Sequence, residues 1–300
     1  MDISFVIPVK DEEKTLEALY GEILAATKPL KKSFEIIFID DGSTDNSLEI
    51  MEKLRKKDKQ VSIIKFRGNF GKSEALSSGF NQAKGKIIIT MDADLQDDPA
   101  EIPKFLTKIN QNYDFVCGWK KEREDPLSKV IPSRFWNFLA STLSGVKLHD
   151  FNCGFKAYKK EVVKSLPLYG ELYRLIPILV AENKFKITEI PVRHRPRKFG
   201  QSKFGWDRFL KGFLDLITIV FLTKFIRRPA HFFGSIGVVL FFIGFIIGCY
   251  ISYLRFSFGN IQGRQPLLLG GILLMVIGVQ LFSTGLLAEM ITYLNRKKAT

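Results

Sequence analysis

Hydrophobic positions along about the first two-thirds of the chain follow two alternating patterns. Short apolar runs rich in β-branched residues predict strands at 3–9, 34–40, 61–66, 86–91, 114–119 and 187–192. Apolar residues three or four positions apart predict helices at 16–24, 47–57, 73–83 and about 133–143. Apolar strands that alternate with amphipathic helices are typical of a mainly parallel sheet covered on both faces. The sequence therefore predicts an α/β fold.

The pattern changes near Pro229, after which charged residues nearly disappear. The runs 231–254 and 266–290 are almost uncharged, and each is long enough to cross a bilayer, for which about 20 residues suffice. Between 204 and 228 aromatic and aliphatic residues are mixed with Lys and Arg, as in a helix that lies in the membrane interface. We therefore expect an α/β domain at 1–203, an interfacial amphipathic helix region at 204–228 and a membrane domain at 229–300.

Positive charge gathers on one side of the two predicted spans. The flanking basic residues are Lys224, Arg227, Arg228, Arg296, Lys297 and Lys298, whereas only Arg255 and Arg264 lie between the spans. By the positive-inside rule, both termini and the large domain are cytoplasmic, which predicts a multi-pass protein of the inner (plasma) membrane. Glycines in both spans permit close helix packing, either within one chain or in a homo-oligomer.

The overall charge and the cysteines narrow the functional classes. The net charge of +14 suits a surface that meets anionic headgroups and a phosphate-bearing substrate, and we do not interpret it as nucleic-acid binding. Cys117, Cys153 and Cys249 have no metal-ligand spacing, which predicts free thiols in a reducing compartment.

Acidic clusters follow two of the predicted strands. Asp92-Ala93-Asp94 comes directly after the strand at 86–91, and Asp40-Asp41 ends the strand at 34–40. Ligands of parallel sheets bind at the carboxyl ends of the strands. Paired carboxylates hold Mg²⁺ or Mn²⁺ together with substrate phosphates, so we interpret the turn that begins at Asp92 as a metal and diphosphate site. Turn formation and helix capping are the alternative for both clusters.

Two further segments carry groups suited to a charged substrate. Asp150 either caps a turn with Asn152 or orients an incoming oxygen nucleophile. The basic run 193–203 can be a headgroup-facing surface, a mobile phosphate-binding loop, or both. An ATP-binding P-loop is excluded, because Phe66 stands where that loop requires glycine, and no G-x-G-x-x-G opens the first helix.

Taken in order, these motifs resemble those of glycosyltransferase family 2, and within it the polyprenyl-phosphate glycosyltransferases related to dolichyl-phosphate mannose synthase and bacterial undecaprenyl-phosphate glucosyltransferases. The matching segments, which extend over nearly the whole chain, are 5–9, 40–43, 69–75, 92–96, 150–154 and 197–203. Asp11-Glu12 departs from the Asn-Glu that the family often has there. The Q-x-x-R-W motif of processive synthases is absent from the sequence, which favours single transfers.

The resemblance implies a GT-A fold, which is Rossmann-like with a mainly parallel sheet, and a role for each matching residue. Asp94 and Asp150 would be catalytic, and Asp92, Asp94 and Gln96 would hold the Mg²⁺ or Mn²⁺. The residues implied to bind the nucleotide sugar are Pro8, Asp11, Glu12, Asp40, Asp41, Lys72, Asp92 and Ala93. Those implied to bind phosphate or acceptor groups are Arg123, Ser133, Arg134, Asn152, Arg195, Arg197, Ser202 and Lys203.

The activity implied by the resemblance is an inverting transfer of glucose from UDP-glucose to undecaprenyl phosphate at the cytoplasmic face of the membrane. The motifs fix a nucleotide sugar without fixing its base or its sugar, so a GDP-mannose-dependent mannosyltransferase is one alternative. A non-catalytic membrane scaffold with a degenerate GT-A fold is the other.

Overall fold

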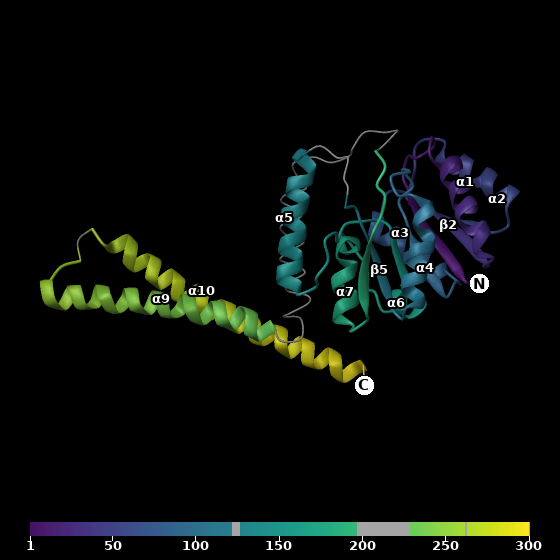
Figure 1. Ribbon diagram of the computed structural model, residues 1–300. Coiled ribbons are helices and arrows are strands. Elements are labelled where there is room, and N and C mark those ends of the chain that lie inside the picture. Colours follow the sequence, from purple (N-terminus) through teal and green to yellow (C-terminus); the bar gives the residue numbers. More distant parts are fainter. Residues whose placement is uncertain (122–126, 197–228, 262, 300) are drawn as a thin grey trace. The chain divides into compact units, whose positions relative to one another are not determined.

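A computed structural model describes residues 1–121, 127–196, 229–261 and 263–299 (Figure 1). The chain forms two compact units, Met1–Asp215 and Leu216–Thr300. The predicted interfacial helix region, 204–228, lies outside the described residues.

Strands and helices alternate along the first unit, as their hydrophobic patterns predict. The strands are β1 (Ile3–Val9), β2 (Phe34–Asp40), β3 (Val61–Lys65), β4 (Ile87–Thr90), β5 (Phe115–Trp119), β6 (Lys156–Lys159) and β7 (Ile187–Pro191). The α-helices are α1 (Leu16–Thr27), α2 (Ser47–Lys57), α3 (Lys72–Gln82), α4 (Ile102–Asn110), α5 (Leu127–Ser144), α6 (Lys160–Lys164) and α7 (Ile176–Glu182). Short 3-10 helices are η1 (Lys28–Leu30), η2 (Pro99–Glu101) and η3 (Leu172–Leu175).

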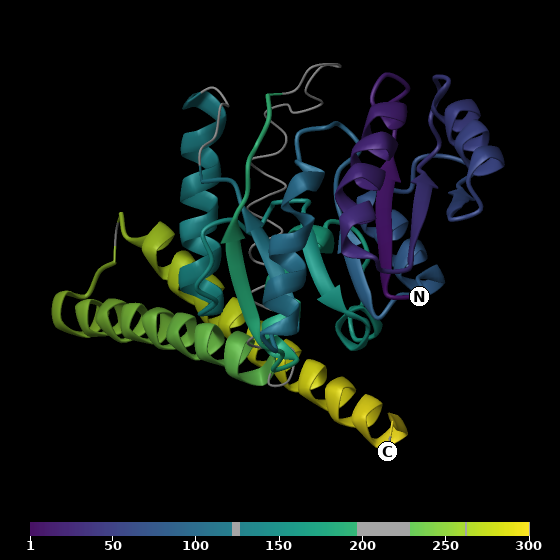
Figure 2. The same ribbon diagram turned by 45° about the vertical axis from the view of Figure 1, so that its right-hand side comes forward.

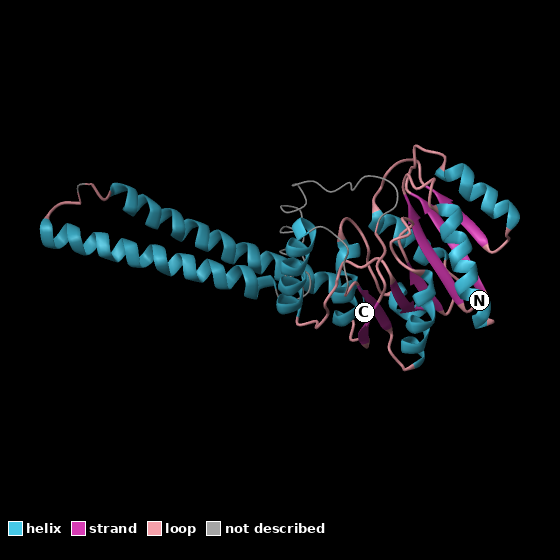
Figure 3. Ribbon diagram, turned by 45° about the horizontal axis from the view of Figure 1, so that its top comes forward, coloured by secondary structure: helices cyan, strands magenta, loops and turns pink. Residues whose placement is uncertain are grey.

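The seven strands form one sheet in the order β3-β2-β1-β4-β6-β5-β7, which Figure 3 shows in magenta. Every neighbouring pair is parallel except the two pairs that involve β6. Helices lie on both faces: α1 contacts α2 and α4, whereas α3 contacts α6 and η3 (Figure 2). The predicted α/β fold with a mainly parallel sheet is therefore confirmed.

The hydrophobic pattern did not predict the strand β6, nor the helices α4, α6 and α7. Strand β6 matters most for the site. It is only four residues long, Lys156–Lys159, and two of them are lysines. Its position depends on side chains that lie far away in the sequence. Tyr158, which is fully buried, packs with Phe80 of α3 and Phe115 of β5 at ring-centroid distances of 5.4 and 5.1 Å. The aromatic core thus holds a strand that has little hydrophobic signal of its own.

The second unit consists of two long apolar helices, α9 (Pro229–Phe258) and α10 (Gln265–Ala299). The stretches Pro229–Phe258 and Gln265–Leu294 are long and apolar enough to cross a membrane, as the sequence predicted. The two helices pack closely at paired glycines. A Cβ atom added to Gly237 would lie 2.5 Å from the carbonyl oxygen of Gly278, and one added to Gly244 would lie 2.4 Å from that of Gly271. These glycines therefore serve packing within one chain.

Candidate active site

The acidic clusters meet at one edge of the sheet because the parallel strands end there. Strand β1 pairs with β2 on one side and with β4 on the other, and both pairs are parallel. The strands β2 and β3 are added on one side of β1 and the later strands on the other, so the strand order switches sides between β1 and β4. Such a switch point opens a crevice beyond the strand ends. Because β6 is antiparallel, the segment that precedes it, which includes Asp150 and Asn152, reaches the same edge.

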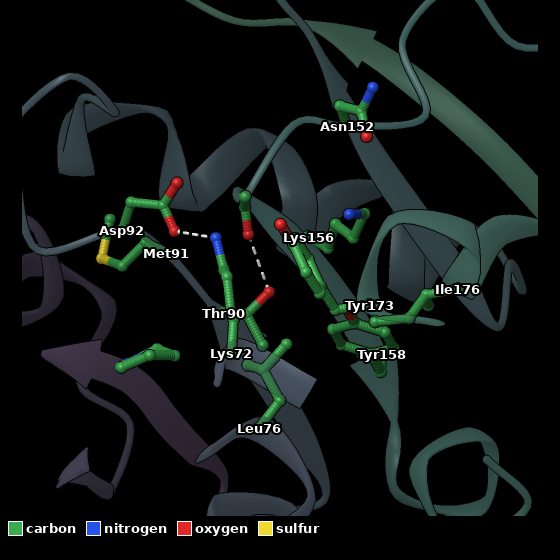
Figure 4. A pocket seen from close by; sticks show the side chains of 12 residues that line it. Lys72, Leu76, Thr90, Met91, Asp92, Asn152, Lys156, Tyr158, Tyr173 and Ile176 are labelled. Carbon is green, nitrogen blue, oxygen red and sulfur yellow. Dashed lines mark hydrogen bonds and ion pairs between the residues drawn. The ribbon is translucent and has the colours of Figure 1, made fainter. Parts of the chain in front are cut away.

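A pocket at this switch point brings together residues from distant parts of the chain (Figure 4). Pro8 of β1, Lys72 of α3, Asp92 after β4 and Asn152 before β6 all line it. Its volume is about 10 Å³, which is about the room of one water molecule. Four residues that the sequence assigned to donor or acceptor binding therefore lie around one narrow pocket.

Lys72 and Asp92 form an ion pair across this pocket. Desolvation opposes the charged form of Lys72, but electrostatic interactions with the Asp92 carboxylate and the Tyr173 phenol group raise its pKa above the ordinary value. Desolvation likewise opposes the charged form of Asp92, whereas Lys72 and Lys120 hold its pKa below the ordinary value. The Lys72 ammonium also lies 5.4 Å from the centroid of the Tyr173 ring. The pair is therefore charged and held in place by its surroundings.

Gly154 makes room for the Asp92 carboxylate. A Cβ atom at position 154 would lie 2.6 Å from Cγ of Asp92. The Gly154 carbonyl oxygen accepts a hydrogen bond of 2.8 Å from the Thr90 hydroxyl, which ties the segment before β6 to the end of β4 (Figure 4). Glycine is thus required at position 154 because the Asp92 carboxylate approaches its backbone too closely for a Cβ atom.

The turn after Asp92 holds the other two predicted metal ligands. Asp94, which is buried, accepts a hydrogen bond of 3.2 Å from the backbone N–H of Gln96. Leu95 between them has φ +61°, the left-handed conformation of a tight turn. Asp97 is also buried, and its Oδ1 lies 3.6 Å from Lys120 Nζ. Desolvation raises the pKa of Asp97, with Lys120 opposing the shift and Asp92 and Asp94 adding to it.

The donor set of this turn fits a hard divalent cation that a substrate helps to coordinate. Two carboxylates and one amide oxygen come from Asp92, Asp94 and Gln96, and oxygen ligands of this kind suit Mg²⁺ or Mn²⁺. Among the described residues, no group of three or more His, Cys, Asp and Glu side chains is arranged to hold a metal ion. A metal at this turn would therefore take further ligands from phosphate oxygens.

The chain after β7 runs along the metal turn. The backbone N–H of Arg195 donates to the carbonyl of Gln96 at 2.9 Å, and Asp97 forms a backbone bridge with His194. The Arg195 guanidinium lies 2.7 Å from both Glu22 of α1 and Asp98. Arg195, predicted to bind phosphate, is here an anchor between α1 and the turn. Arg197, Ser202 and Lys203 lie outside the described residues.

The acidic residues at and just beyond the ends of β1 and β2 organise the neighbouring loops. Asp41 accepts hydrogen bonds from the backbone N–H groups of Phe70 and Gly71, at 2.7 and 3.1 Å. Asp40 accepts from Ser43 N at 2.9 Å, and Asp11 accepts from Thr44 N at 2.7 Å. The remaining sequence-predicted donor residues, Glu12 and Ala93, lie in the loops after β1 and β4. These contacts are the turn chemistry kept open as an alternative, and they fix the loops that border the pocket.

Asp150 is buried beside the pocket, and its carboxylate accepts a hydrogen bond of 3.1 Å from Asn152 N. The amide oxygen of Asn152 is buried and accepts no hydrogen bond from the described part of the chain. Phe151 N donates to Asn137 of α5 at 3.3 Å, so α5 supports this segment. Ser133 lies on α5 as well. Arg123 and the side chain of Arg134 lie outside what the structure describes.

Several side chains at the site were not singled out by the sequence. Tyr173 lines the pocket, Lys120 contacts the metal turn, and His149 pairs with Glu189 of β7. Of these, Lys120 follows the end of a predicted strand and His149 directly precedes Asp150, so both carry a local signal. Tyr173 and Glu189 are brought to the site by the fold alone.

Comparisons with known proteins agree on one family. The model of the glycosyl transferase family 2 matches residues 4–166. The chain is 37% identical over 296 residues to the dodecaprenyl-phosphate galacturonate synthase of Rhizobium johnstonii, with 97% of this chain and 88% of that protein covered. It is 35% identical over 291 residues to the undecaprenyl-phosphate 4-deoxy-4-formamido-L-arabinose transferase of Yersinia pestis, with 96% and 88% covered.

A solved structure shares the fold of the first unit. Glucosyl-3-phosphoglycerate synthase from Mycobacterium tuberculosis, in complex with Mn²⁺, uridine diphosphate and phosphoglyceric acid, superposes with a TM-score of 0.56. The two are 18% identical, and the match covers 74% of this chain and 78% of that one. At this identity the likeness concerns the fold.

Proposed function

Because this chain belongs to glycosyl transferase family 2 and is a polyprenyl-phosphate sugar transferase, we propose that it transfers a sugar from a UDP-linked donor to undecaprenyl phosphate with inversion at the anomeric carbon. The single observation that carries the proposal is the pocket at the β1/β4 switch point, where Lys72, Asp92 and Asn152 meet. Groups suited to a diphosphate and groups suited to an acceptor line the same space. A degenerate scaffold would have no need to keep them together.

We assign donor binding to the Lys72 side of this pocket. Asp92, Asp94 and Gln96 would hold Mg²⁺ or Mn²⁺, which when bound offsets the negative charge of the diphosphate. The Lys72 ammonium would contact the same phosphates, since it lies beside Asp92 in the pocket. The solved relative with uridine diphosphate and Mn²⁺ supports a UDP-linked donor and a divalent metal.

Asp150 would act on the acceptor. A phosphate oxygen is already ionised near neutral pH, so the carboxylate would orient the nucleophile rather than remove a proton. Burial and the hydrogen bond from Asn152 N hold that carboxylate in one place.

The sugar remains the open part of the proposal. Glucose is the sugar expected from the sequence, whereas the relative with 37% identity is named for galacturonate. GDP-mannose is the further donor to compare. The basic residues that flank the spans support spans that cross a bacterial inner membrane, with the first unit on the cytoplasmic side.

The test is sugar transfer by the full chain in detergent, with undecaprenyl phosphate as acceptor. UDP-glucose, UDP-galacturonate and GDP-mannose are supplied in turn, with Mg²⁺, with Mn²⁺ or with a chelator. We expect a labelled lipid from a UDP-sugar, lost with chelator and in Asp94→Asn at an unchanged melting temperature. Transfer by Asp94→Asn at the wild-type rate would refute the metal assignment, and no labelled lipid from any donor would refute the activity.

A further inference from the structure

A second and larger cavity lies between the end of β5, the helix α5 and the segment 147–149. Its volume is about 500 Å³. Lys120, Lys121 and Lys147 contribute three ammonium groups to its lining, and none of the described residues that line it carries a carboxylate. A compact anion would therefore be attracted to this cavity.

The remaining wall is largely apolar. Trp119, Phe138 and Leu148 contribute to it, and the Phe138 side chain is 68% exposed. Exposed aromatic surface beside clustered cations suits a molecule with an anionic group and a hydrocarbon part. A free inorganic anion would leave this apolar wall without a partner.

One histidine in this cavity is held in a fixed orientation although its side chain is 64% exposed. The His149 ring stacks on Trp119 with centroids 4.2 Å apart and planes 16° apart. Its Nδ1 pairs with Glu189 Oε1, and Glu189 Oε2 accepts the backbone N–H of His149 at 2.8 Å. Since Nδ1 is engaged by a carboxylate, a ligand in the cavity would meet Nε2, and the imidazolium form of the ring would donate a hydrogen bond from Nε2 to an anion.

The cavity adjoins the reaction site through two of its lining residues. Lys120 Nζ lies 3.6 Å from Oδ1 of Asp97, in the metal turn. His149 directly precedes Asp150, the residue assigned to the acceptor. An anion bound here would therefore lie on the acceptor side of the site.

We propose that this cavity binds the phosphate of the polyprenyl acceptor, with Lys147, Lys120 and His149 as phosphate ligands and Glu189 as a positioning residue for His149. The proposal rests on the proposed function. The cations match the phosphate, and the apolar wall matches the first carbons of the chain that carries it. A carboxylate on the donor sugar has similar oxyanion chemistry, so the test separates the two sources.

The test uses the full chain in detergent with farnesyl phosphate, a short soluble prenyl phosphate. The variants are His149→Ala and Lys147→Ala, and the matched control is Lys56→Ala, an exposed lysine on α2. We measure direct binding of farnesyl phosphate without donor, and the KM for lipid and for donor. Loss of one charged hydrogen bond predicts a rise of about tenfold in the lipid KM and in the Kd. The donor KM and the Lys56→Ala control stay at wild-type values.

Glu189→Gln tests whether Glu189 positions the His149 ring or only contributes to folding. It retains hydrogen bonding but loses the charge that holds the imidazole, so the lipid KM rises by less than in His149→Ala while kcat changes little. In the His149→Ala background, Glu189→Gln should have no further effect on the lipid KM. Additive effects of the two substitutions would contradict the positioning role.

Three results would be decisive against these assignments. Unchanged farnesyl phosphate binding and lipid KM in His149→Ala and Lys147→Ala would overturn the proposal. A donor KM that rises only for UDP-galacturonate would overturn it as well, and would assign the cavity to the sugar acid. If the wild type transferred no sugar at all, the proposed function would fail, while the binding measurement would still decide whether the cavity takes a prenyl phosphate.

Discussion

The ammonium of Lys72, at the first position of α3, pairs with the carboxylate of Asp92, just beyond the end of β4. The two residues are 20 positions apart in the sequence and meet inside the narrow pocket at the switch point. A donor diphosphate bound at the opening of this pocket would meet a lysine and a potential metal ligand together.

Lys72→Met should weaken donor binding. The substitution keeps an unbranched side chain but removes the charge that faces the phosphates, which predicts a rise in the donor KM of about tenfold or more. Steady-state kinetics with the lipid held at saturation measures it. Lys53→Ala, on the exposed surface of α2, is the control, and a donor KM equal to wild type in Lys72→Met would contradict the assignment.

Gly154→Ala tests the close approach to Asp92. The added methyl group would meet the Asp92 carboxylate at 2.6 Å, so that side chain must move. We expect transfer activity to fall at least about tenfold, because a misplaced catalytic group of this kind commonly costs that much. The control is Gly68→Ala, because Gly68 has open space around its Cβ position and no positive φ. Gly145→Ala would be unsuitable, since Gly145 has φ +76° and any side chain there would strain the backbone. Full activity in Gly154→Ala would show that Asp92 tolerates displacement.

Substitutions at the contacts of Arg195 distinguish two roles for this residue, an anchor between α1 and the metal turn or a phosphate ligand. Glu22→Gln breaks one arm of the anchor without touching the pocket, since Glu22 lies on α1. If anchoring is the role of Arg195, then Glu22→Gln and Arg195→Ala should both lower the melting temperature, with non-additive effects in the double variant. A large rise in the donor KM in Arg195→Ala, with no change in melting temperature, would instead favour a phosphate ligand.

The paired glycines of α9 and α10 predict a sharp difference between two substitutions. Gly237→Leu places a side chain against the backbone of α10, whereas a Cβ atom at position 248 would meet nothing within 4 Å, so that Gly248→Leu begins in open space. Gly237→Leu should therefore lower the thermal stability of the protein in detergent, and Gly248→Leu should leave it near wild type. Equal melting temperatures for the two variants would contradict this packing.

Asp114 provides a pH-dependent contribution to stability. The pKa of Asp114 lies below its ordinary value of 3.8. Desolvation acts to raise this pKa, but hydrogen bonds from the Lys159 side chain and the Lys186 backbone lower it by more. A lowered pKa stabilises the folded state above pH 3.8, and that stabilisation is lost as the pH falls through the folded pKa. Asp114→Asn should therefore destabilise the protein by about 1 kcal/mol at pH 7 and by less below pH 3.8. The free energy of unfolding of the wild type and of Asp114→Asn, measured at pH 7 and below pH 3.8, checks this prediction. The same difference between the two proteins at both pH values would contradict it.

The sequence by itself determined the elements whose hydrophobic signal is local. The strands β1, β2 and β4 are continuous apolar runs, and the membrane-length part of each long helix contains almost no charge, so the strands and the helix α9 were predicted within a few residues. The helix α10 begins one residue before the predicted span but continues through a charged end to Ala299, beyond the predicted end at 290. The metal turn was found for the same reason, because Asp92, Asp94 and Gln96 are close together in the sequence and follow a strand.

Tertiary structure alone decided which distant groups meet. The antiparallel β6 brings Asp150 and Gly154 to the ligand-binding edge, and its short polar sequence gives no sign of this. The pairing of His149 with Glu189 joins residues 40 positions apart. Gly237 faces Gly278 only because α9 and α10 pack antiparallel. Local patterns specify where a chain is buried, whereas contacts between distant segments depend on the order and direction in which those segments pack.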